Sequence, residues 1–278
     1  MLVSYFTQIK SYTVMKKVSI ITINYNNAKG LERTINSVIN QTYKWIEYII
    51  IDGKSTDDSP TIINRNSSKI SWSCSEPDSG IYDAMNKGIK HATGDFLLFL
   101  NSGDSFICKH SLEKLMKKDI NADLIICRQK FISTNGKVGS SPKIQEAEID
   151  IKYFLSSTFP HQSTLIRRSL FNKIGMYDTT YKVSADWVFW VKAVIEYKCS
   201  IKTLPIFITY MEDGGVSRNI KKCHDDMSKL LNDYMNQGLI CWDDIFDIAI
   251  SARRQTYCNR YILTRFISKA CAWIGKHI

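Results

Sequence analysis

The sequence contains no run of about 18 or more apolar residues, which is the length that a membrane-spanning helix needs. Its first residues also lack the apolar stretch and the small-residue cleavage site of a secretory signal peptide. The eight cysteines are scattered without a CxxC pair, so we expect reduced and mostly buried thiols. These absences predict a cytoplasmic protein, at most peripheral on the inner face of the cell membrane.

Two common nucleotide-binding signatures are missing as well. No GxGxxG sequence follows the first expected strand, and no Walker A sequence is present. Both absences disfavour a dinucleotide-dependent dehydrogenase and a P-loop NTPase.

Acidic residues are absent from residues 249–278, and this segment holds six basic residues. It therefore carries over half of the formal net charge of +10 of the whole chain. Such a local basic surface argues against a general nucleic-acid binder. Within residues 253–278 the apolar side chains share one helix face with basic residues beside it, as in helices that lie at a membrane surface. The alternatives are that this face binds an anionic membrane or packs on the rest of the protein.

The first hundred residues alternate between expected strands and helices. Apolar, β-branched runs predict strands at residues 18–23, 46–51 and 69–73. A helical stripe covers residues 31–39, and Ser59 followed by Pro60 predicts the N-cap and first turn of the next helix. This alternation predicts right-handed crossovers and a parallel sheet.

Residues 76–104 are the stretch around which the chain is organised. A polar turn precedes an amphipathic helix over residues 81–92, Gly94 ends that helix, and residues 96–100 form a fully buried strand. Three expected strands then end in polar clusters at residues 24–27, 52–57 and 101–104. Because carboxyl ends of parallel strands share one edge, these clusters should converge on one crevice. Its carboxylates and aromatic ring suit a cation bridging phosphates and a ring stacked on a base.

The second half of the chain is less regular. We expect strands at residues 124–127, 164–166 and 203–210, and a hairpin turn at residues 135–136. A short helix over residues 169–174 should end at Gly175, and Ser184 should begin another helix. Residues 214–217 are expected to form a mobile loop, followed by helix.

Five stretches, in the same order as in a known family, carry a resemblance. They are VSIITINYN, IIIDGKSTDDS, GIYDAMNKGIKHATGDFLLFLNSGD, FPHQSTLIRRSLFNKIGMYD and SADWVF. The chain resembles family-2 inverting glycosyltransferases of the GT-A fold, in particular bacterial enzymes of surface-polysaccharide biosynthesis. The resemblance implies an α/β fold: a nucleotide-binding, mostly parallel sheet flanked by helices, with a C-terminal helical appendage. The expected parts are an extension at 1–15, a catalytic domain at 16–217 and a basic, amphipathic helical region at 218–278.

The resemblance also implies an activity. A sugar would move from a nucleotide-diphosphate donor, with a UDP-sugar expected, to a hydroxyl of a glycan or lipid-linked acceptor, with inversion and with Mg²⁺ or Mn²⁺ as cofactor. Asp104 matches the metal ligand, Asp186 the catalytic base, and His161 is expected at the acceptor or a phosphate. The expected donor-binding residues are Tyr25, Asn26, Asp52, Asp83 and Asn101.

Simpler interpretations accompany these roles. Tyr25 could be a core residue, Asp104 a cap of the following segment, and Asp186 a complement to a helix dipole. Asp83 could only pair with Lys87, and Asp78 could only form its turn. Arg167 and Arg168 are expected to be surface charges rather than residues that clamp the diphosphate.

Two departures from the family pattern stand out. Gly53 and Gly103 occupy positions where the family often has an acid that contacts the nucleoside. They support an alternative reading, in which a degenerate transferase fold acts as a non-catalytic binding or scaffold subunit. A nucleic-acid binder, based on the basic C-terminal segment, is the third class considered.

Overall fold

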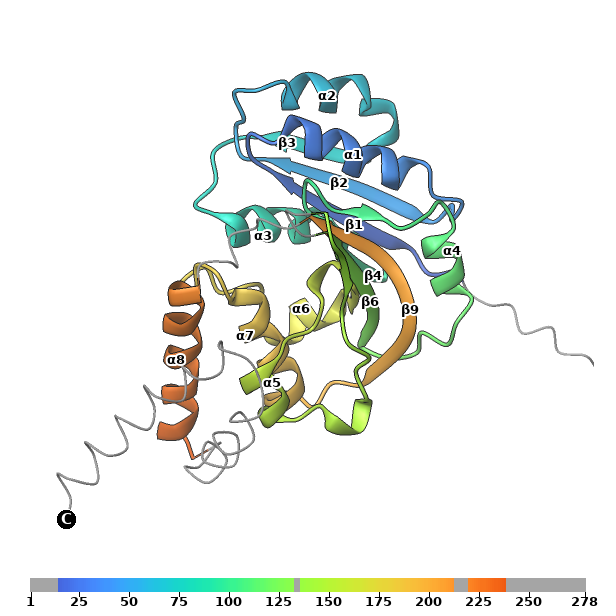
Figure 1. The fold of residues 1–278 in the computed structure, drawn as a ribbon. Helices are drawn as coiled ribbons and strands as arrows, with labels where there is room; N and C mark the ends of the chain where they lie inside the picture. Colours follow the sequence, from blue (N-terminus) through green and yellow to red (C-terminus); the bar gives the residue numbers. More distant parts are fainter. Residues whose placement is uncertain (1–14, 133–135, 213–219, 239–278) are drawn as a thin grey trace, which may run out of the picture.

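The computed structural model describes residues 15–132, 136–212 and 220–238. Their strands form one sheet in the order β3-β2-β1-β4-β8-β6-β9-β5, and β7 pairs with β6 (Figure 1). The bounds are β1 Val18–Asn24, β2 Ile46–Asp52, β3 Trp72–Ser75, β4 Phe96–Phe99, β5 Ser105–Phe106, β6 Leu124–Ile132, β7 Val138–Ser140, β8 Thr164–Arg167 and β9 Ile201–Glu212.

Helices cover both faces of the sheet (Figure 1). On one side lie α1, α2 and α4, and on the other lie α3 and α5 to α8. The bounds are α1 Ala28–Ile39, α2 Ser59–Arg65, α3 Ile81–His91, α4 Ser111–Met116, α5 Ile151–Ser156, α6 Ser169–Ile174, α7 Ala185–Val191 and α8 Ile220–Asn236.

Strand β1 shows why these segments fold as they do. All its residues are buried, and successive side chains point to opposite faces. Ile20 packs with Leu31 of α1, whereas Ile21 packs with Met85 of α3. An uninterrupted apolar run therefore supplies two cores at once, which is typical of a strand covered on both faces.

The predicted fold class is confirmed. The strand pairs β1–β2, β1–β4 and β2–β3 are parallel, and so is the pair β6–β9. Strand β8 runs antiparallel to both β4 and β6, so the second half of the sheet is mixed. Strands β6 and β7 pair antiparallel, and residue 135 of the hairpin turn expected between them lies outside the described residues.

Three local expectations were wrong. Helix α3 ends at His91 with Ala92 as its C-cap, so Gly94 lies beyond the end of the helix. Residues 67–69 form a 3₁₀ turn, so β3 begins at Trp72 rather than at residue 69. Ser59 lies within α2, and the N-cap position belongs to Asp58. The side-chain acceptor for the first turn comes from Asp57, whose Oδ1 accepts the Ser59 N–H at 3.0 Å.

The described part of the C-terminal region is α8, which packs into the core. Leu230, Leu231 and Tyr234 are buried there, and Asp226 Oδ2 accepts the backbone N–H groups of Val183 and Ser184. The expected mobile loop at 214–217 and the expected basic helix at 253–278 lie outside the described residues. Within the described ranges, every helix is too short or too polar to cross a membrane.

Candidate active site

The loops after β1, β2 and β4 are joined by side-chain hydrogen bonds. Asn24 Nδ2 donates to Asp52 Oδ1 at 2.8 Å, and Asn27 Nδ2 donates to the Ser102 carbonyl at 3.1 Å. Gly53 N–H also donates to the Asn24 carbonyl at 2.8 Å. The predicted convergence of three polar clusters on one edge of the sheet is therefore confirmed.

Asp52 lies at the centre of these loops and has no exposed surface. Its Oδ1 accepts from Asn24 and from Ser55 Oγ at 2.6 Å. Its Oδ2 accepts from Ser55 N–H at 2.9 Å and from Ser75 Oγ at 2.6 Å. Four donors thus occupy both oxygens, as a buried carboxylate requires. Direct contact with a donor stays a prediction for Asp52, and the geometry favours a role in holding the loops.

Tyr25 follows β1 and is 67% exposed, so the interpretation that it belongs to the core is wrong. Its ring lies over Gly53: a β-carbon built on that glycine would be 3.2 Å from Tyr25 Cδ2. The next residue, Asn26, has a left-handed φ of 48°, which asparagine tolerates well. Its Oδ1 accepts the Thr56 N–H at 2.8 Å. An exposed ring is therefore presented on a fixed backbone at this edge.

Asp104 is buried in a turn that helix α1 holds. Thr34 Oγ1 donates to the Asp104 carbonyl at 2.7 Å and accepts the Gly103 N–H at 3.0 Å. The Arg33 guanidinium donates to the Gly103 carbonyl at 2.8 Å. Gly103 has a φ of 106°, an angle that an acid at this position would adopt only with strain. The segment that follows Asp104 is strand β5.

The residues around Asp104 fit a cation that binds together with a diphosphate. Among the described residues there is no group of three or more His, Cys, Asp or Glu side chains able to hold a metal alone. Asn101 Oδ1 is buried and accepts no hydrogen bond from a described residue. Mg²⁺ takes one or two protein oxygens and completes its shell with substrate phosphates and water. Asp104 and Asn101 offer that kind of incomplete set.

Asp186 lies in the first turn of α7 and is partly exposed. The Tyr82 hydroxyl, from α3, lies 2.7 Å from Asp186 Oδ1 and 2.7 Å from the Val183 carbonyl. Ser184 occupies the N-cap position as expected, but its side chain makes no capping bond. Helix α3 begins at the turn beside Gly53 and therefore links the loop edge to this carboxylate.

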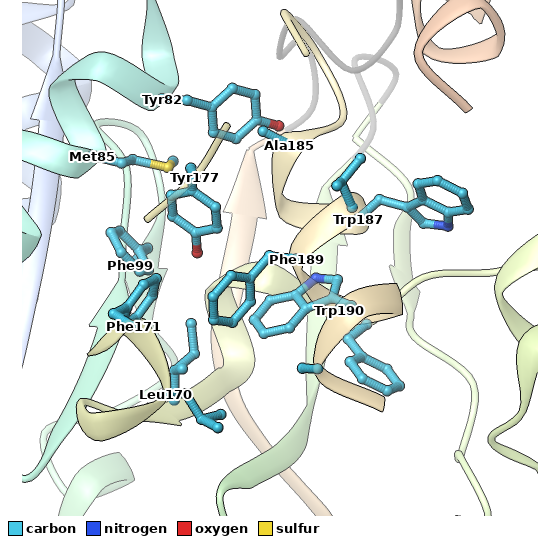
Figure 2. Packing of buried hydrophobic residues seen from close by; sticks show 14 of the residues in the cluster. Tyr82, Met85, Phe99, Leu170, Phe171, Tyr177, Ala185, Trp187, Phe189 and Trp190 are labelled. Carbon is cyan, nitrogen blue, oxygen red and sulfur yellow. The ribbon is translucent and has the colours of Figure 1, made fainter. Parts of the chain in front are cut away.

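His161 is buried among the rings of Phe99, Tyr177 and Trp190. Figure 2 shows these three rings. His161 stacks on Phe99 at 5.0 Å between centroids, and its Nε2 lies 3.1 Å from the Tyr177 hydroxyl. Burial lowers the pKa of His161, partly offset by the charge of Asp186. Burial raises the pKa of Tyr177, and Asp186 adds to that shift. A neutral, bonded ring fits a structural histidine, and contact with an acceptor or phosphate stays a prediction.

Sequence reasoning missed Tyr82 and Tyr177 as neighbours of Asp186. Tyr82 lies three and seven residues before Met85 and Ile89, so helical spacing already placed it on the buried side. Tyr177 had no such signal, because its contact with His161 joins two loops.

Asp83, Arg167 and Arg168 have partners within the protein, and donor binding by Asp83 stays a prediction. Asp83 Oδ2 accepts the Ser79 N–H at 2.9 Å and lies 3.9 Å from Lys87 Nζ, so the expected pair with Lys87 is present. Arg167 pairs with Asp123 at 3.3 Å, and Arg168 donates to the Gly94 carbonyl at 2.9 Å. Asp123 precedes β6 and Gly94 precedes β4, so both lie at the edge of the sheet opposite the loops that follow β1, β2 and β4. The prediction that these arginines are not diphosphate clamps agrees with that placement.

The fold is that of GT-A glycosyltransferases. TarS of Staphylococcus aureus (residues 1–349, in complex with UDP) matches with a TM-score of 0.61 and 22% identity, over 76% of this chain and 63% of that chain. The mannosyltransferase PcManGT of Pyrobaculum calidifontis, in complex with GDP-Man and Mn²⁺, matches with a TM-score of 0.60 and 16% identity, over 93% of this chain and 81% of that chain.

The sequence comparisons identify the family. Residues 19–175 match the model of glycosyl transferase family 2. An uncharacterized glycosyltransferase of Mycobacterium tuberculosis is 33% identical over 229 residues, which are 80% of this chain and 82% of the relative. A PGL/p-HBAD biosynthesis glycosyltransferase of Mycobacterium bovis is 30% identical over 209 residues, 73% of this chain and 79% of the relative. The chain belongs to glycosyl transferase family 2.

Proposed function

We propose that this glycosyltransferase moves a sugar from a nucleoside-diphosphate donor to a hydroxyl of a glycan or lipid-linked acceptor, with inversion, during synthesis of a surface glycan. One observation carries the proposal. The Tyr82 hydroxyl, on a helix that starts at the donor-side loops, is in hydrogen-bond contact with Asp186. The donor-side loops, with a ring and carboxylates suited to a nucleotide, are thereby connected to Asp186, a carboxylate suited to proton transfer.

The donor side uses the loop edge. Tyr25 offers a stacking surface for a base, and Asp104 with Asn101 would hold Mg²⁺ or Mn²⁺ against the diphosphate. Support comes from the complexes of structural neighbours, which contain UDP, UDP-GlcNAc or GDP-Man with Mn²⁺. When bound, the cation neutralises the charge that grows on the leaving diphosphate.

The acceptor side uses Asp186. Tyr82 holds Oδ1 at 2.7 Å, and Oδ2 accepts the proton of the attacking hydroxyl. The acceptor hydroxyl attacks the anomeric carbon from the face opposite the diphosphate, through an oxocarbenium-like transition state, and the diphosphate leaves. One displacement inverts the anomeric configuration without a covalent glycosyl-enzyme. The PGL/p-HBAD relative supports a lipid-linked or surface-glycan acceptor.

A donor screen tests this function. The melting temperature of the full chain is measured with Mn²⁺ and each of a panel of nucleotide-sugars, and the best ligand is then assayed for release of nucleoside diphosphate with glycan and lipid-linked acceptors. We expect one donor class to raise the melting temperature and to turn over. Binding without turnover across the acceptors would indicate a scaffold subunit, and no binding at all would reject the proposal.

A further inference from the structure

Gly53 has no side chain, and the space beside it is occupied by the carboxylate of Asp78. A β-carbon built on Gly53 would lie 2.6 Å from Asp78 Oδ2 and 3.2 Å from Tyr25 Cδ2. The carboxylate of Asp78 and the ring of Tyr25 therefore meet above this glycine. An acid at residue 53 would have to displace Asp78, so the two positions compete for one space.

The turn that carries Asp78 is held at both ends. Asp78 Oδ1 accepts the Gly80 N–H at 2.9 Å. Lys87 Nζ donates to the Pro77 carbonyl at 2.8 Å and pairs with Glu76 at 2.9 Å, which fastens the turn to α3. Glu76 N–H donates to the Asp52 carbonyl at 3.0 Å, which fastens it to β2. Asp78 Oδ2 is thus directed over Gly53 by a fixed backbone.

We propose that Asp78 selects the base of the nucleotide donor, by accepting an N–H from a base that lies on Tyr25. This inference rests on the proposed function and names its substrate class. The Asp78 carboxylate would select bases with an imide or lactam N–H, as in uracil, thymine and guanine. Cytosine and adenine present an acceptor nitrogen at the equivalent ring position.

The selection follows from the chemistry of a carboxylate. An ionised aspartate has acceptors and no donor, so it cannot pair with an acceptor nitrogen. A site built around such a group rejects a ligand that leaves the group unpaired. Asp52 cannot do this, because four protein donors already occupy its oxygens. Gly53 has no side chain, so Asp78 supplies the acceptor beside Tyr25.

Calorimetric titration with nucleoside diphosphates tests the assignment. Wild-type protein with Mg²⁺ is titrated with UDP, dTDP, GDP, CDP and ADP, and at least one of the first three should bind about tenfold more tightly than CDP and ADP. Asp78→Ala and Asp78→Asn should reduce this preference to about threefold or less. Asn keeps the size of the side chain and an acceptor for Gly80. Asp58→Asn, which removes an exposed carboxylate from the loop after β2, should leave the preference unchanged.

A relocated carboxylate makes the test sharper. Gly53 has no left-handed backbone angle, so once Asp78 is gone a side chain there needs only a small shift of the exposed Tyr25 ring, 3.2 Å from its β-carbon. Gly53→Asp combined with Asp78→Ala should restore the base preference that Asp78→Ala loses. A double variant as indiscriminate as Asp78→Ala would contradict the inference, and so would folded Asp78 variants that discriminate like wild type. If wild-type protein binds none of the five nucleotides, the proposed function fails first and the inference with it.

Discussion

Two carboxylates near the site have opposite surroundings. Asp52 is fully buried and its oxygens receive four donors, whereas Asp186 is partly exposed and shares one hydroxyl with a backbone carbonyl. A saturated carboxylate holds its neighbours in place, whereas Asp186 Oδ2, which accepts no hydrogen bond from a described residue, can accept a proton. We therefore assign a positioning role to Asp52 and a reacting role to Asp186.

Tyr82→Phe tests that assignment at the residue scale. The change removes the hydroxyl 2.7 Å from Asp186 Oδ1, so the ionised carboxylate loses a donor. Because hydrogen bonds to charged groups contribute about 1.5–3 kcal/mol, kcat/KM should fall by roughly 10- to 150-fold. The loss should lie in kcat, because Tyr82 supports the carboxylate that takes the proton.

Nucleotide affinity should stay constant in Tyr82→Phe, because the hydroxyl does not reach the donor loops. Tyr153→Phe removes a hydroxyl whose acceptor is the Thr158 carbonyl, and it should leave kcat/KM unchanged. An unchanged kcat/KM in Tyr82→Phe would show that Asp186 acts without this support.

Asp104→Ala tests the metal role. We expect it to weaken the binding of UDP or GDP in the presence of Mn²⁺ by at least about tenfold, since a hard cation loses its carboxylate ligand. EDTA should abolish turnover of the wild-type protein. Asp119→Asn, an exposed carboxylate beyond α4, is the matched control. Full turnover in EDTA would refute metal dependence.

At the scale of elements, α3 depends on close contact with the sheet. A β-carbon on Gly88 would lie 2.5 Å from Ile21 Cγ2 and 2.9 Å from Ile51 Cδ1. Alanine is the better helix former by about 1 kcal/mol, but overpacking a core costs about 1–3 kcal/mol. We predict that Gly88→Ala lowers the free energy of unfolding by up to about 2 kcal/mol, measured by urea denaturation.

Lys90→Ala changes an exposed position of the same helix and should leave the unfolding free energy nearly unchanged. Because α3 carries Tyr82, Gly88→Ala should also reduce activity. A Gly88→Ala protein more stable than wild type would mean that helix propensity outweighs packing here.

Elements with a strong apolar pattern were predictable, and elements defined by their partners were not. The uninterrupted runs of β1, β2 and β4 identified buried strands, because both faces of each are covered. Strand β3 is a half-exposed edge, so its sequence carried a weak signal and its start was misplaced. The antiparallel direction of β8 depends on pairing with β4 and β6, which no local pattern records.

The candidate site divides in the same way. Polar clusters after buried strands predicted where the loops converge, because carboxyl ends of parallel strands share an edge. The saturation of Asp52 could not be predicted, since its donors come from β1, β3 and its own loop. The position of Asp78 above Gly53 depends on how the 76–80 turn folds over β2.

At the scale of the whole molecule, the edge opposite the loops contributes stability rather than chemistry. Buried Glu47 accepts hydrogen bonds there from Lys17 Nζ at 2.7 Å, Ser19 Oγ at 2.6 Å and Thr93 N–H at 2.7 Å. Burial alone would raise the pKa of Glu47, but these bonds outweigh it and hold the pKa at about 2 instead of 4.5.

This depressed pKa predicts a pH dependence of stability. A carboxyl whose folded pKa lies below its unfolded pKa stabilises the protein above the unfolded value. The contribution is lost as pH falls from about 4.5 towards about 2, and it is of the order of 3 kcal/mol. Glu47→Gln should therefore lower the free energy of unfolding at pH 7 and flatten its pH dependence in acid.

Urea denaturation between pH 7 and pH 3 measures both effects. Glu32→Gln breaks an exposed pair with Arg65 and should change little, as surface ion pairs usually contribute 0 to about 1 kcal/mol. A Glu47→Gln protein that retains the slope of wild type would assign the acid sensitivity to other carboxylates.

We propose Asp186 as the base that deprotonates the acceptor, and the kcat of Asp186→Asn is the decisive measurement. Asparagine keeps the size of the side chain and an acceptor for Tyr82 but cannot take the proton. We predict that kcat falls by roughly 10²–10⁴-fold, the usual range for general base catalysis, with nucleotide affinity and melting temperature close to wild type. Turnover within a few-fold of wild type would contradict the claim.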